Sequence, residues 1–341
     1  MTASLPRVTA VMLAYGDEPV LGEAVGAVLG STGVDVDLVL VDNGCTSGAV
    51  GDLPEDARLT VLTPSENLGF AGGVNHGASG ARGDLLALVN SDAVVAPDAL
   101  SRLTEVALRP GVGIASGSIR LASDPGLMNS AGNPVHVVGL SWAGGLGERA
   151  DRHDEEKDVA SASGACLVLE KELWERLDGF ADEYFAYHED VDLSWRTWMA
   201  GRRVVYVPSA VVVHHYEFSR NPLKMYLLEK NRQVFVRTTY GDRLLAVLRP
   251  PMAALDVVLR LVARSQGWGA EKRRADAWVA ENADWIARRR RAVQARRSVP
   301  DREIVHLLTA QLDQQVFSTP PGTGLLQTVM KAYWRAVRRF V

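Results

Sequence analysis

The 341-residue sequence predicts an α/β protein with a mostly parallel, doubly wound sheet, followed by a helical C-terminal extension. The apolar runs 38–41 and 85–89 are bounded by polar residues, which is typical of strands buried on both faces of a parallel sheet. Segments with helical spacing alternate with these runs, and this alternation favours strand–helix–strand units. A change to arginine-bearing helical segments after residue 240 predicts the extension.

In the N-terminal third, strands are expected at 8–14, 38–41, 59–62 and 85–89, and helices at 19–29 and 73–81. A further helix is expected to begin near Pro97, because proline fits the first helical turn, where its missing N–H would have no partner. Between residues 112 and 170 the pattern changes to short strands and glycine-rich connections.

The following part predicts a strand at 167–169, a helix at 171–177 and an amphipathic helix at 189–200. In the last of these, apolar residues recur at helical spacing from Val191 onward and therefore share one face. The strand expected at 204–213 contains Pro208, which indicates an edge strand or a bent strand.

The extension begins with an apolar segment, 244–263, that arginines, prolines and Asp256 interrupt. The sequence has no run of about 18 uncharged apolar residues, so no membrane span is predicted, although this segment could lie on a bilayer. No signal-type segment precedes the first strand, and we expect a cytoplasmic protein. We divide the chain into an α/β domain, 1–240, and a helical, basic region, 241–341.

Charge is distributed unevenly along the chain. The net charge is −4, but residues 1–242 carry 19 Lys and Arg against 33 Asp and Glu, whereas residues 243–297 carry 13 against 5. The basic part suggests an anionic partner, either a lipid surface, a lipid diphosphate or a nucleic acid, unless it is only a solvated helix face. The two cysteines, Cys45 and Cys166, fit neither a zinc site nor a disulfide scaffold and indicate a reducing compartment.

Two carboxylates follow predicted strands. Asp42 comes at the end of the run 38–41, and Asp92 comes three residues after the run 85–89. Ligands of open parallel sheets bind beyond the carboxyl ends of the strands. We therefore expect Asp42 and Asp92 on one rim, where a nucleotide and its metal ion would be held.

Three further carboxylates, Glu189, Asp190 and Asp192, lie in the first turn of the predicted amphipathic helix. One acid there would be explained by the helix dipole. Three acids in one turn repel one another, so the helix dipole alone does not explain them. A carboxylate held rigidly at a helix N-terminus can serve as a general base, and we expect such a role here.

A histidine pair, His214 and His215, ends the strand expected at 204–213. A single histidine in such a place is commonly a core residue. Beside a strand-end carboxylate such as Asp92, however, an imidazole and phosphate oxygens would suit Mg²⁺ or Mn²⁺.

The segment 66–77 is rich in glycine and leads into a predicted helix. Glycines there would let backbone N–H groups approach phosphate or sugar oxygens. The segment matches neither the dinucleotide fingerprint nor the P-loop, so its glycines alone are a weak signal.

Together these motifs resemble the inverting glycosyltransferases of family 2, which have the Rossmann-like GT-A fold, and in particular their rhamnosyltransferase and galactofuranosyltransferase-like branch. The resemblance covers residues 5–235. The matching stretches are 41–44, 67–75, 89–92, 163–166, 189–193 and 201–215.

The resemblance implies roles for individual residues. Asp190 would be the catalytic base, and Glu189, Asp192, Gly164 and Ala165 would contact the acceptor or donor sugar. Asp92 would bind Mg²⁺ or Mn²⁺ with His214, or alternatively with His215; Asn90 stands where the family usually has a first aspartate. The nucleotide-binding residues would be Ala14, Tyr15, Gly16, Asp42, Asn43, Asn67, Gly72, Asn75, Asn90 and Ser91. The basic stretch 230–232 would lie near the diphosphate or the acceptor.

The implied function is transfer of a sugar, with inversion, from a nucleotide donor to a hydroxyl of a lipid-linked glycan or a cell-envelope polysaccharide. L-Rhamnose from dTDP-rhamnose is the first expectation; a UDP-sugar of the galactofuranose type, or a natural-product acceptor, is the alternative. A glycosidase and a non-catalytic nucleotide-sugar-binding protein are rival interpretations. The basic extension would contact the inner face of the plasma membrane peripherally, and no nucleic-acid partner is expected.

Overall fold

The computed structural model describes residues 4–216, 221–313 and 323–341. The chain forms two compact units. The first contains the residues up to Asn133, the segment Ala143–Thr197 and the residues from Arg202 to the end of the last long strand. The second contains Pro134–Trp142, Trp198–Gly201 and the C-terminal helices.

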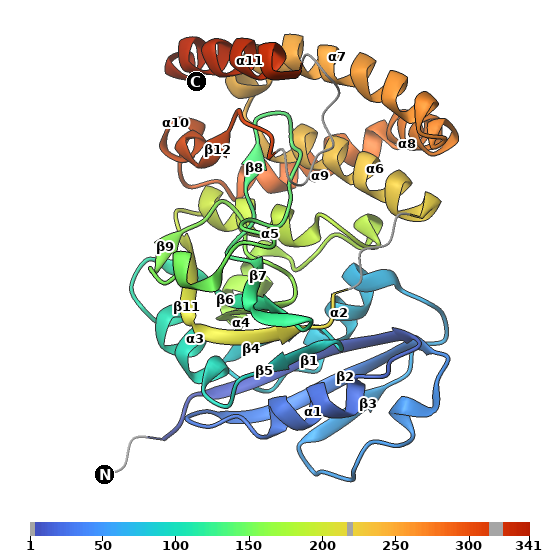
Figure 1. Ribbon diagram of the computed structural model, residues 1–341, viewed down its shortest axis with the longest axis vertical. Coiled ribbons are helices and arrows are strands. Elements are labelled where there is room, and N and C mark those ends of the chain that lie inside the picture. The colour runs from blue at the N-terminus through green and yellow to red at the C-terminus, as the bar shows by residue number, and fades with distance from the viewer. Residues whose placement is uncertain (1–3, 217–220, 314–322) are drawn as a thin grey trace. The chain divides into compact units, whose positions relative to one another are not determined.

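A ten-stranded sheet forms the centre of the first unit (Figure 1). Eight strands follow one another across it in the order β3 (Leu59–Leu62), β2 (Asp35–Cys45), β1 (Arg7–Gly16), β4 (Leu85–Val89), β10 (Cys166–Glu170), β6 (Val112–Leu121), β11 (Arg203–His214) and β5 (Ala93–Val95). Two more strands pair at the side, β7 (Asp124–Ser130) with β6 and β9 (Lys157–Asp158) with β11.

The strands from β3 to β4 run parallel to one another, and so do β6 and β11. Strand β10 runs antiparallel to both of its neighbours, and β5 runs antiparallel to β11. The register of β1 and β2 places Ala14 opposite Asp42. The carboxyl ends of β1, β2 and β4 therefore meet at one edge of the sheet, as the sequence predicts.

Helices cover both faces of the sheet. Helices α1 (Leu21–Leu29) and α3 (Ala99–Ala107) pack on the face that carries Val8, Ala10 and Met12. Helices α2 (Gly69–Ser79) and α4 (Lys171–Leu177) contact strands from the opposite side. Successive side chains of β1 point to opposite faces of the sheet, and helices cover both faces. Residues 8–14 of β1 are therefore all buried, which explains why this part of the sequence is almost entirely apolar.

The second unit consists mainly of helices. These are α6 (Pro222–Thr239), α7 (Asp242–Ser265), α8 (Gly269–Glu281), α9 (Ala283–Ala295), α10 (Asp301–Ile304) and α11 (Thr323–Val337). A short parallel pair, β8 (Val135–His136) and β12 (Leu308–Thr309), accompanies them. Asn221 caps helix α6: its side chain accepts a hydrogen bond from the backbone N–H of Lys224, and Pro222 is the first residue of the helix.

The predicted elements are present, and three of them, 59–62, 85–89 and 171–177, have the predicted bounds. Strand β11 is bent rather than at the edge: it pairs with β6 and β5, and its register with β6 shifts between Tyr206 and Val211, around Pro208. Helix α7 continues through Pro250 and Pro251. Among the described helices, none is long and apolar enough to span a bilayer.

The division at residue 240 stays a prediction. By their contacts, residues of α6 group with the second unit, although the sequence places them in the first region. The segment Pro134–Trp142 also groups with the second unit, and no local pattern in the sequence indicates that.

Candidate active site

Asp92 and His214 lie side by side at the carboxyl edge of the sheet. Asp92 follows β4, and His214 is the last residue of β11. The backbone N–H of His215 donates to the carbonyl of Asp92 (2.9 Å), which fixes the two segments together. The Nε2 atom of His214 then lies 3.0 Å from Oδ1 of Asp92.

The other ring nitrogen of His214 is held by Asn129, a buried residue of β7. Nδ1 lies 2.9 Å from Oδ1 of Asn129, and a carbonyl oxygen can only accept, so Nδ1 carries the hydrogen. In the neutral ring the Nε2 lone pair then faces the Asp92 carboxylate, which is also an acceptor. Two acceptors at this distance need a cation between them, either a proton or a metal ion. The donor set of one carboxylate and one imidazole fits Mn²⁺ or Mg²⁺.

His215 differs from His214 in its surroundings. Its side chain is exposed, and its backbone N–H, not its imidazole, makes the hydrogen bond to Asp92. Of the two alternatives, the geometry places the imidazole of His214, not that of His215, against the Asp92 carboxylate.

Asp190 is connected to the same edge through the loop at Gly164 and Ala165. It lies in the first turn of α5 (Glu189–Met199), where its Oδ2 accepts from the N–H of Gly164 (3.0 Å) and its Oδ1 from the N–H of Val191 (2.7 Å). The carbonyl of Ala165, the next residue, accepts from the N–H of Asn90 (3.0 Å). Burial raises the pKa of Asp190, and the two backbone hydrogen bonds oppose this rise.

Glu189 is buried beside Asp190. Among the described residues its Oε2 has no hydrogen-bond partner. Burial first, and then the charge of Asp190, raises the pKa of Glu189 well above its ordinary value. Burial and the charge of Asp190 therefore both favour the protonated form of Glu189.

Asp192 has a structural position that the sequence interpretation did not anticipate. Its carboxylate is fully buried; one oxygen accepts from the hydroxyl of Tyr184 (2.9 Å) and the other from Nε of Arg196 (2.7 Å). Arg196 also donates to the carbonyls of Leu177 and Gly179. Both oxygens of Asp192 are thus bonded within the protein and anchor the chain before α5, whereas its expected contact with a sugar stays a prediction.

The chain before α5 is strained. Phe185, Tyr187 and His188 have φ angles of 63°, 67° and 75°, in the left-handed region that residues with a side chain rarely adopt. The carbonyl of Phe185 accepts from the N–H of Ala71 (3.0 Å) in the first turn of α2. Such strain persists only where surrounding contacts fix the chain, and here it sets the position of Glu189 and Asp190.

Tyr15, which is exposed, and Asp42, which is half-buried, lie near the ends of β1 and β2. Oδ1 of Asp42 accepts from the backbone N–H of Cys45 (2.9 Å), which closes a turn around Gly44, whose φ is 110°. A Cβ atom at Gly44 would lie 3.7 Å from the ring of Tyr15, so the ring lies beside this turn. The ring is 57% exposed and offers a flat surface to a planar ligand.

The polar residues of the glycine-rich segment serve mainly to hold loops. Asn43 donates to Oδ1 of Asn67 (2.8 Å) and accepts from the N–H of Leu68 (2.9 Å). The amide of Asn75 both donates to and accepts from the backbone of Phe180. These side chains make hydrogen bonds within the protein, and their expected contacts with a nucleotide stay a prediction.

The glycines of α2 have a packing role. A Cβ atom at Gly73 would lie 2.0 Å from Cδ1 of Leu13, and one at Gly77 would lie 2.6 Å from Cγ1 of Val11. A Cβ at Gly72 would lie 3.2 Å from that of Leu68. Gly73 and Gly77 therefore let the helix approach the sheet closely, and the expected approach of this segment to phosphate stays a prediction.

Glu18 is a site residue that the sequence interpretation missed. Its buried carboxylate accepts from the backbone N–H of Tyr15 (2.9 Å) and from the hydroxyl of Ser91 (2.9 Å), so it joins the end of β1 to the segment of Asp92. Burial raises the pKa of Glu18. Glu18 follows a predicted strand, as Asp42 and Asp92 do. The expectation that polar residues after parallel strands meet at one edge of the sheet therefore applies to Glu18 as well. No comparable signal marks Asn129.

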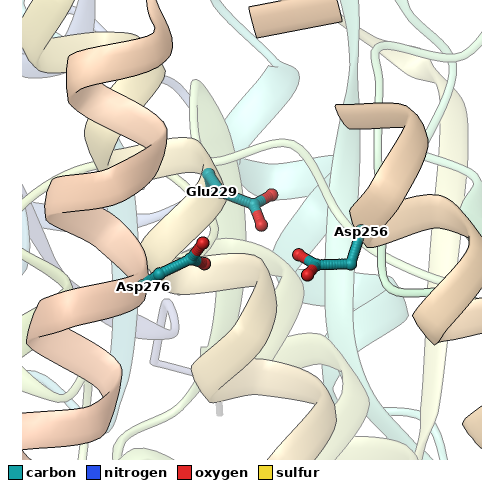
Figure 2. Close-up of side chains that lie close together, drawn as sticks. All are labelled: Glu229, Asp256 and Asp276. Atoms are coloured by element: carbon teal, nitrogen blue, oxygen red, sulfur yellow. The ribbon is translucent and has the colours of Figure 1, made fainter. Parts of the chain in front are cut away.

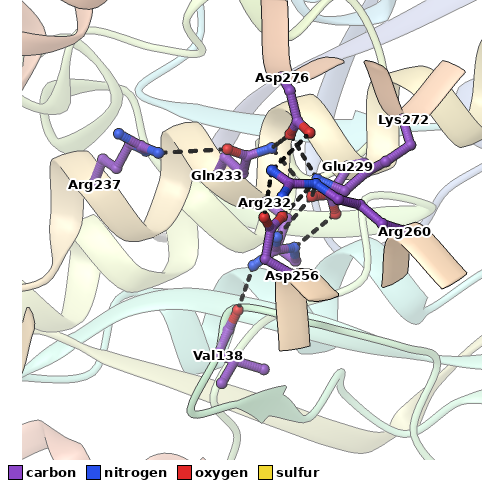
Figure 3. A network of polar contacts seen from close by, with 9 residues as sticks. All are labelled: Val138, Glu229, Arg232, Gln233, Arg237, Asp256, Arg260, Lys272 and Asp276. Carbon is purple, nitrogen blue, oxygen red and sulfur yellow. Dashed lines mark hydrogen bonds and ion pairs between the residues drawn. The ribbon is translucent and has the colours of Figure 1, made fainter. Parts of the chain in front are cut away.

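A second carboxylate cluster lies in the second unit. One ligand oxygen each from Glu229, Asp256 and Asp276 lie within 4.8 Å of one another (Figure 2). The ammonium of Lys272 lies among them, 2.6 Å from Asp256, 2.6 Å from Asp276 and 3.0 Å from Glu229 (Figure 3). The attraction of these carboxylates outweighs burial and raises the pKa of Lys272. A lysine thus provides the cation that three carboxylates require, and the cluster is an ion-pair network.

The basic stretch 230–232 is also part of the second unit. Arg232 forms an ion pair with Glu229 (2.7 Å), and the ammonium of Lys230 lies 4.8 Å from the centre of the Trp278 ring. Its expected place near the diphosphate or the acceptor stays a prediction.

Comparison with known proteins identifies relatives of the chain. A family model described as "Glycosyltransferase like family 2" matches residues 6–236. The N-acetylglucosaminyl-diphospho-decaprenol L-rhamnosyltransferase of Mycobacterium tuberculosis is 31% identical over 243 residues, which are 63% of this chain and 77% of that protein. The uncharacterized protein y4gI of Sinorhizobium fredii is 31% identical over 215 residues, 59% of this chain. The chain spans only 23% of the length of y4gI.

Two solved structures have a similar fold. GalNAc-T7 with UDP, GalNAc and Mn²⁺ matches with a TM-score of 0.58 at 16% identity, covering 73% of this chain and 51% of that chain. The mannosyltransferase PcManGT from Pyrobaculum calidifontis, in complex with GDP-Man and Mn²⁺, matches with a TM-score of 0.51 at 20% identity, covering 98% of this chain and 86% of that chain. The predicted GT-A fold with C-terminal helices is confirmed.

Proposed function

Because this chain belongs to the glycosyltransferase-like family 2, we propose that it transfers a sugar from a nucleotide donor to an acceptor hydroxyl with inversion of configuration. One observation carries the proposal: Asp190 is joined, through Gly164 and Ala165, to the segment of Asp92 that also meets His214. A base and a pair of metal ligands thus meet at the carboxyl edge of the sheet, where nucleotides bind in open α/β folds.

Asp190 acts as the general base in this proposal. It takes the proton of the acceptor hydroxyl while the acceptor oxygen bonds to the anomeric carbon from the face opposite the leaving group. The bond between the anomeric carbon and the diphosphate oxygen breaks in the same step, and the nucleoside diphosphate leaves with the electron pair. The hydrogen bonds from Gly164 and Val191 orient the Asp190 carboxylate for this transfer.

Asp92 and His214 would hold Mg²⁺ or Mn²⁺ at the donor diphosphate. When bound, the ion supplies positive charge that stabilises the departing diphosphate. Asn129 keeps Nε2 of His214 free for coordination, and Glu18 holds Ser91 beside Asp92. Tyr15 and Asp42 would contact the nucleoside.

We propose dTDP-L-rhamnose as the donor and a lipid-linked glycan as the acceptor. The support is the relative named as a rhamnosyltransferase acting on a diphospho-decaprenol, 31% identical over 63% of this chain. A UDP-sugar of the galactofuranose type is the alternative donor, and a natural-product aglycone is the alternative acceptor.

A panel of nucleotide sugars, each with and without Mn²⁺, tests the proposal by release of nucleoside diphosphate and by the anomeric configuration of the product. We expect dTDP-rhamnose to give the highest rate and an inverted product. Asp190→Asn should lower the rate roughly 10²–10⁴-fold. Glu172→Gln, which removes an acid from the first turn of α4, is the matched control and should retain the rate. A retained anomeric configuration, or normal turnover by Asp190→Asn, would contradict the mechanism.

A further inference from the structure

One face of α7 is exposed and apolar along its whole length. The exposed residues recur every three or four positions and therefore lie in one stripe. We call this stripe the outer face of α7; it consists of Arg243, Ala246, Pro250, Ala253, Val257, Leu261 and Arg264. The side chains of Val257 and Leu261 are 56% and 65% exposed, whereas Leu244 and Leu248, on the opposite side of the helix, are fully buried.

The charge of this face has a single sign. Arginines stand at both ends of the stripe, and the exposed Arg249 lies beside it. After the first residue of α7, its only acidic residue is Asp256, which is bound to Lys272 (2.6 Å) inside the ion-pair network. The outer face of α7 therefore combines apolar side chains with cations and has no carboxylate of its own.

The C-terminal segment that lies beside α7 has the same character. The hydroxyl of Tyr333 in α11 donates to the carbonyl of Val247, which places these two helices next to each other (Figure 1). Residues 323–341 contain four Lys and Arg and no acidic residue. Val329 and Phe340 are 56% and 62% exposed.

We propose that the outer face of α7 docks on the surface of an anionic lipid bilayer. Helices with an apolar face flanked by arginines lie in the plane of the bilayer interface, with the apolar side chains among the acyl chains and the cations at the phosphates. At 24 residues, α7 is about 36 Å long, which gives an extended line of contact. The helix does not need to cross the bilayer.

Charge complementarity distinguishes this occupant from a second copy of the chain. If two outer faces packed together, arginines would meet arginines, and no carboxylate of the stripe could neutralise them. An anionic lipid surface supplies the missing negative charge. The inference goes beyond sugar transfer and does not depend on the identity of the donor.

Flotation of the full-length protein with vesicles tests the proposal. Vesicles of phosphatidylcholine with phosphatidylglycerol should bind the protein at low ionic strength, and vesicles of phosphatidylcholine alone should bind it at least about tenfold more weakly. The double variant Val257→Asp, Leu261→Asp should lower binding to anionic vesicles about tenfold or more. Leu108→Asp, which changes a 50% exposed leucine at the end of α3, is the matched control and should bind like the wild type.

Circular dichroism and nucleoside diphosphate release establish that each variant is folded, and both should match the wild type. Equal binding to neutral and anionic vesicles, or normal binding by the double variant, would overturn the proposal. So would a dimer of the wild-type protein that the double variant dissociates, since a second copy would then be the occupant. Vesicle binding requires no turnover, so a protein that does not bind vesicles could still transfer the sugar as proposed. Likewise, a protein that does not transfer the sugar could still bind vesicles.

Discussion

Asn129 illustrates how one residue outside the recognised motifs can determine the chemistry of a site. Its side-chain oxygen accepts from Nδ1 of His214 and so leaves Nε2 directed at Asp92. Hydrogen bonds to the far nitrogen of a metal-binding histidine orient the ring and set its tautomer. Asn129 should therefore influence metal affinity although it is not itself a metal ligand.

Replacing Asn129 by leucine should therefore weaken Mn²⁺ binding roughly 10–100-fold. Asn129→Asp keeps an acceptor at the same position and should retain most of the affinity. Electron paramagnetic resonance titration of free Mn²⁺, in the presence of a nucleoside diphosphate, measures both variants. Unchanged affinity in Asn129→Leu would show that His214 does not depend on this contact.

The pair Glu189 and Asp190 predicts a particular pH profile. Burial raises the pKa of Asp190, and catalysis needs its ionised form, so the rate should fall as the pH falls through this raised pKa. Burial and the neighbouring charge of Asp190 favour the protonated form of Glu189, and glutamine mimics a protonated glutamate. Glu189→Gln should thus leave the acidic limb of kcat/KM in place. A displacement of the limb by about one pH unit or more would show that Glu189 is ionised beside Asp190.

Among the elements, α2 depends most clearly on the absence of side chains. Gly77 faces Val11 and Val41 of the sheet at distances that a Cβ atom could not occupy without displacing them. The exposed Gly26 of α1, in contrast, has open space around it. The two helical glycines form a natural pair for measuring packing separately from helix propensity.

Gly77→Ala should lower the free energy of unfolding by about 1–3 kcal/mol, because the added methyl group overpacks the interface. Gly26→Ala should raise it by about 0.5–1 kcal/mol, because alanine is the better helix former and fits without strain. Urea denaturation compares the two variants with the wild type. If both substitutions stabilised the protein, α2 would not pack as closely as described.

At the scale of the whole molecule, buried charge organises the second unit. Lys272 connects α6, α7 and α8 through Glu229, Asp256 and its own helix neighbour Asp276. Its side chain is 2% exposed, whereas that of Arg260, which also pairs with Asp256, is 60% exposed. Lys272 and Arg260 therefore differ in how much water screens them.

Lys272→Met should destabilise the protein by about 3–5 kcal/mol, because it removes the buried cation that all three carboxylates share. Arg260→Met should cost no more than about 1 kcal/mol, because its ion pairs are screened by solvent. Thermal and urea unfolding measure the difference. A similar effect of the two substitutions would mean that Lys272 is more solvated than the structure shows.

The sequence alone was sufficient for the elements and for the rim residues. Strands such as 85–89 and the helix 171–177 follow from local patterns of apolar residues, and the rule that strand ends meet at one edge placed Asp42 and Asp92 there. The same rule would have found Glu18. It could not separate Asp190 from Asp192, because both lie in one helical turn and differ only in what the rest of the fold places against them.

The periodicity of apolar residues in the sequence therefore determined which segments become strands or helices. It also determined which polar residues lie at the ends of these elements. The tertiary structure decided which of those residues have partners, since hydrogen bonds such as His214 to Asn129 or Asp190 to Gly164 join positions 85 and 26 residues apart. It also decided that Lys272 lies among three carboxylates. A local pattern cannot encode such contacts, because the energy of a buried polar group depends on neighbours that only folding brings to it.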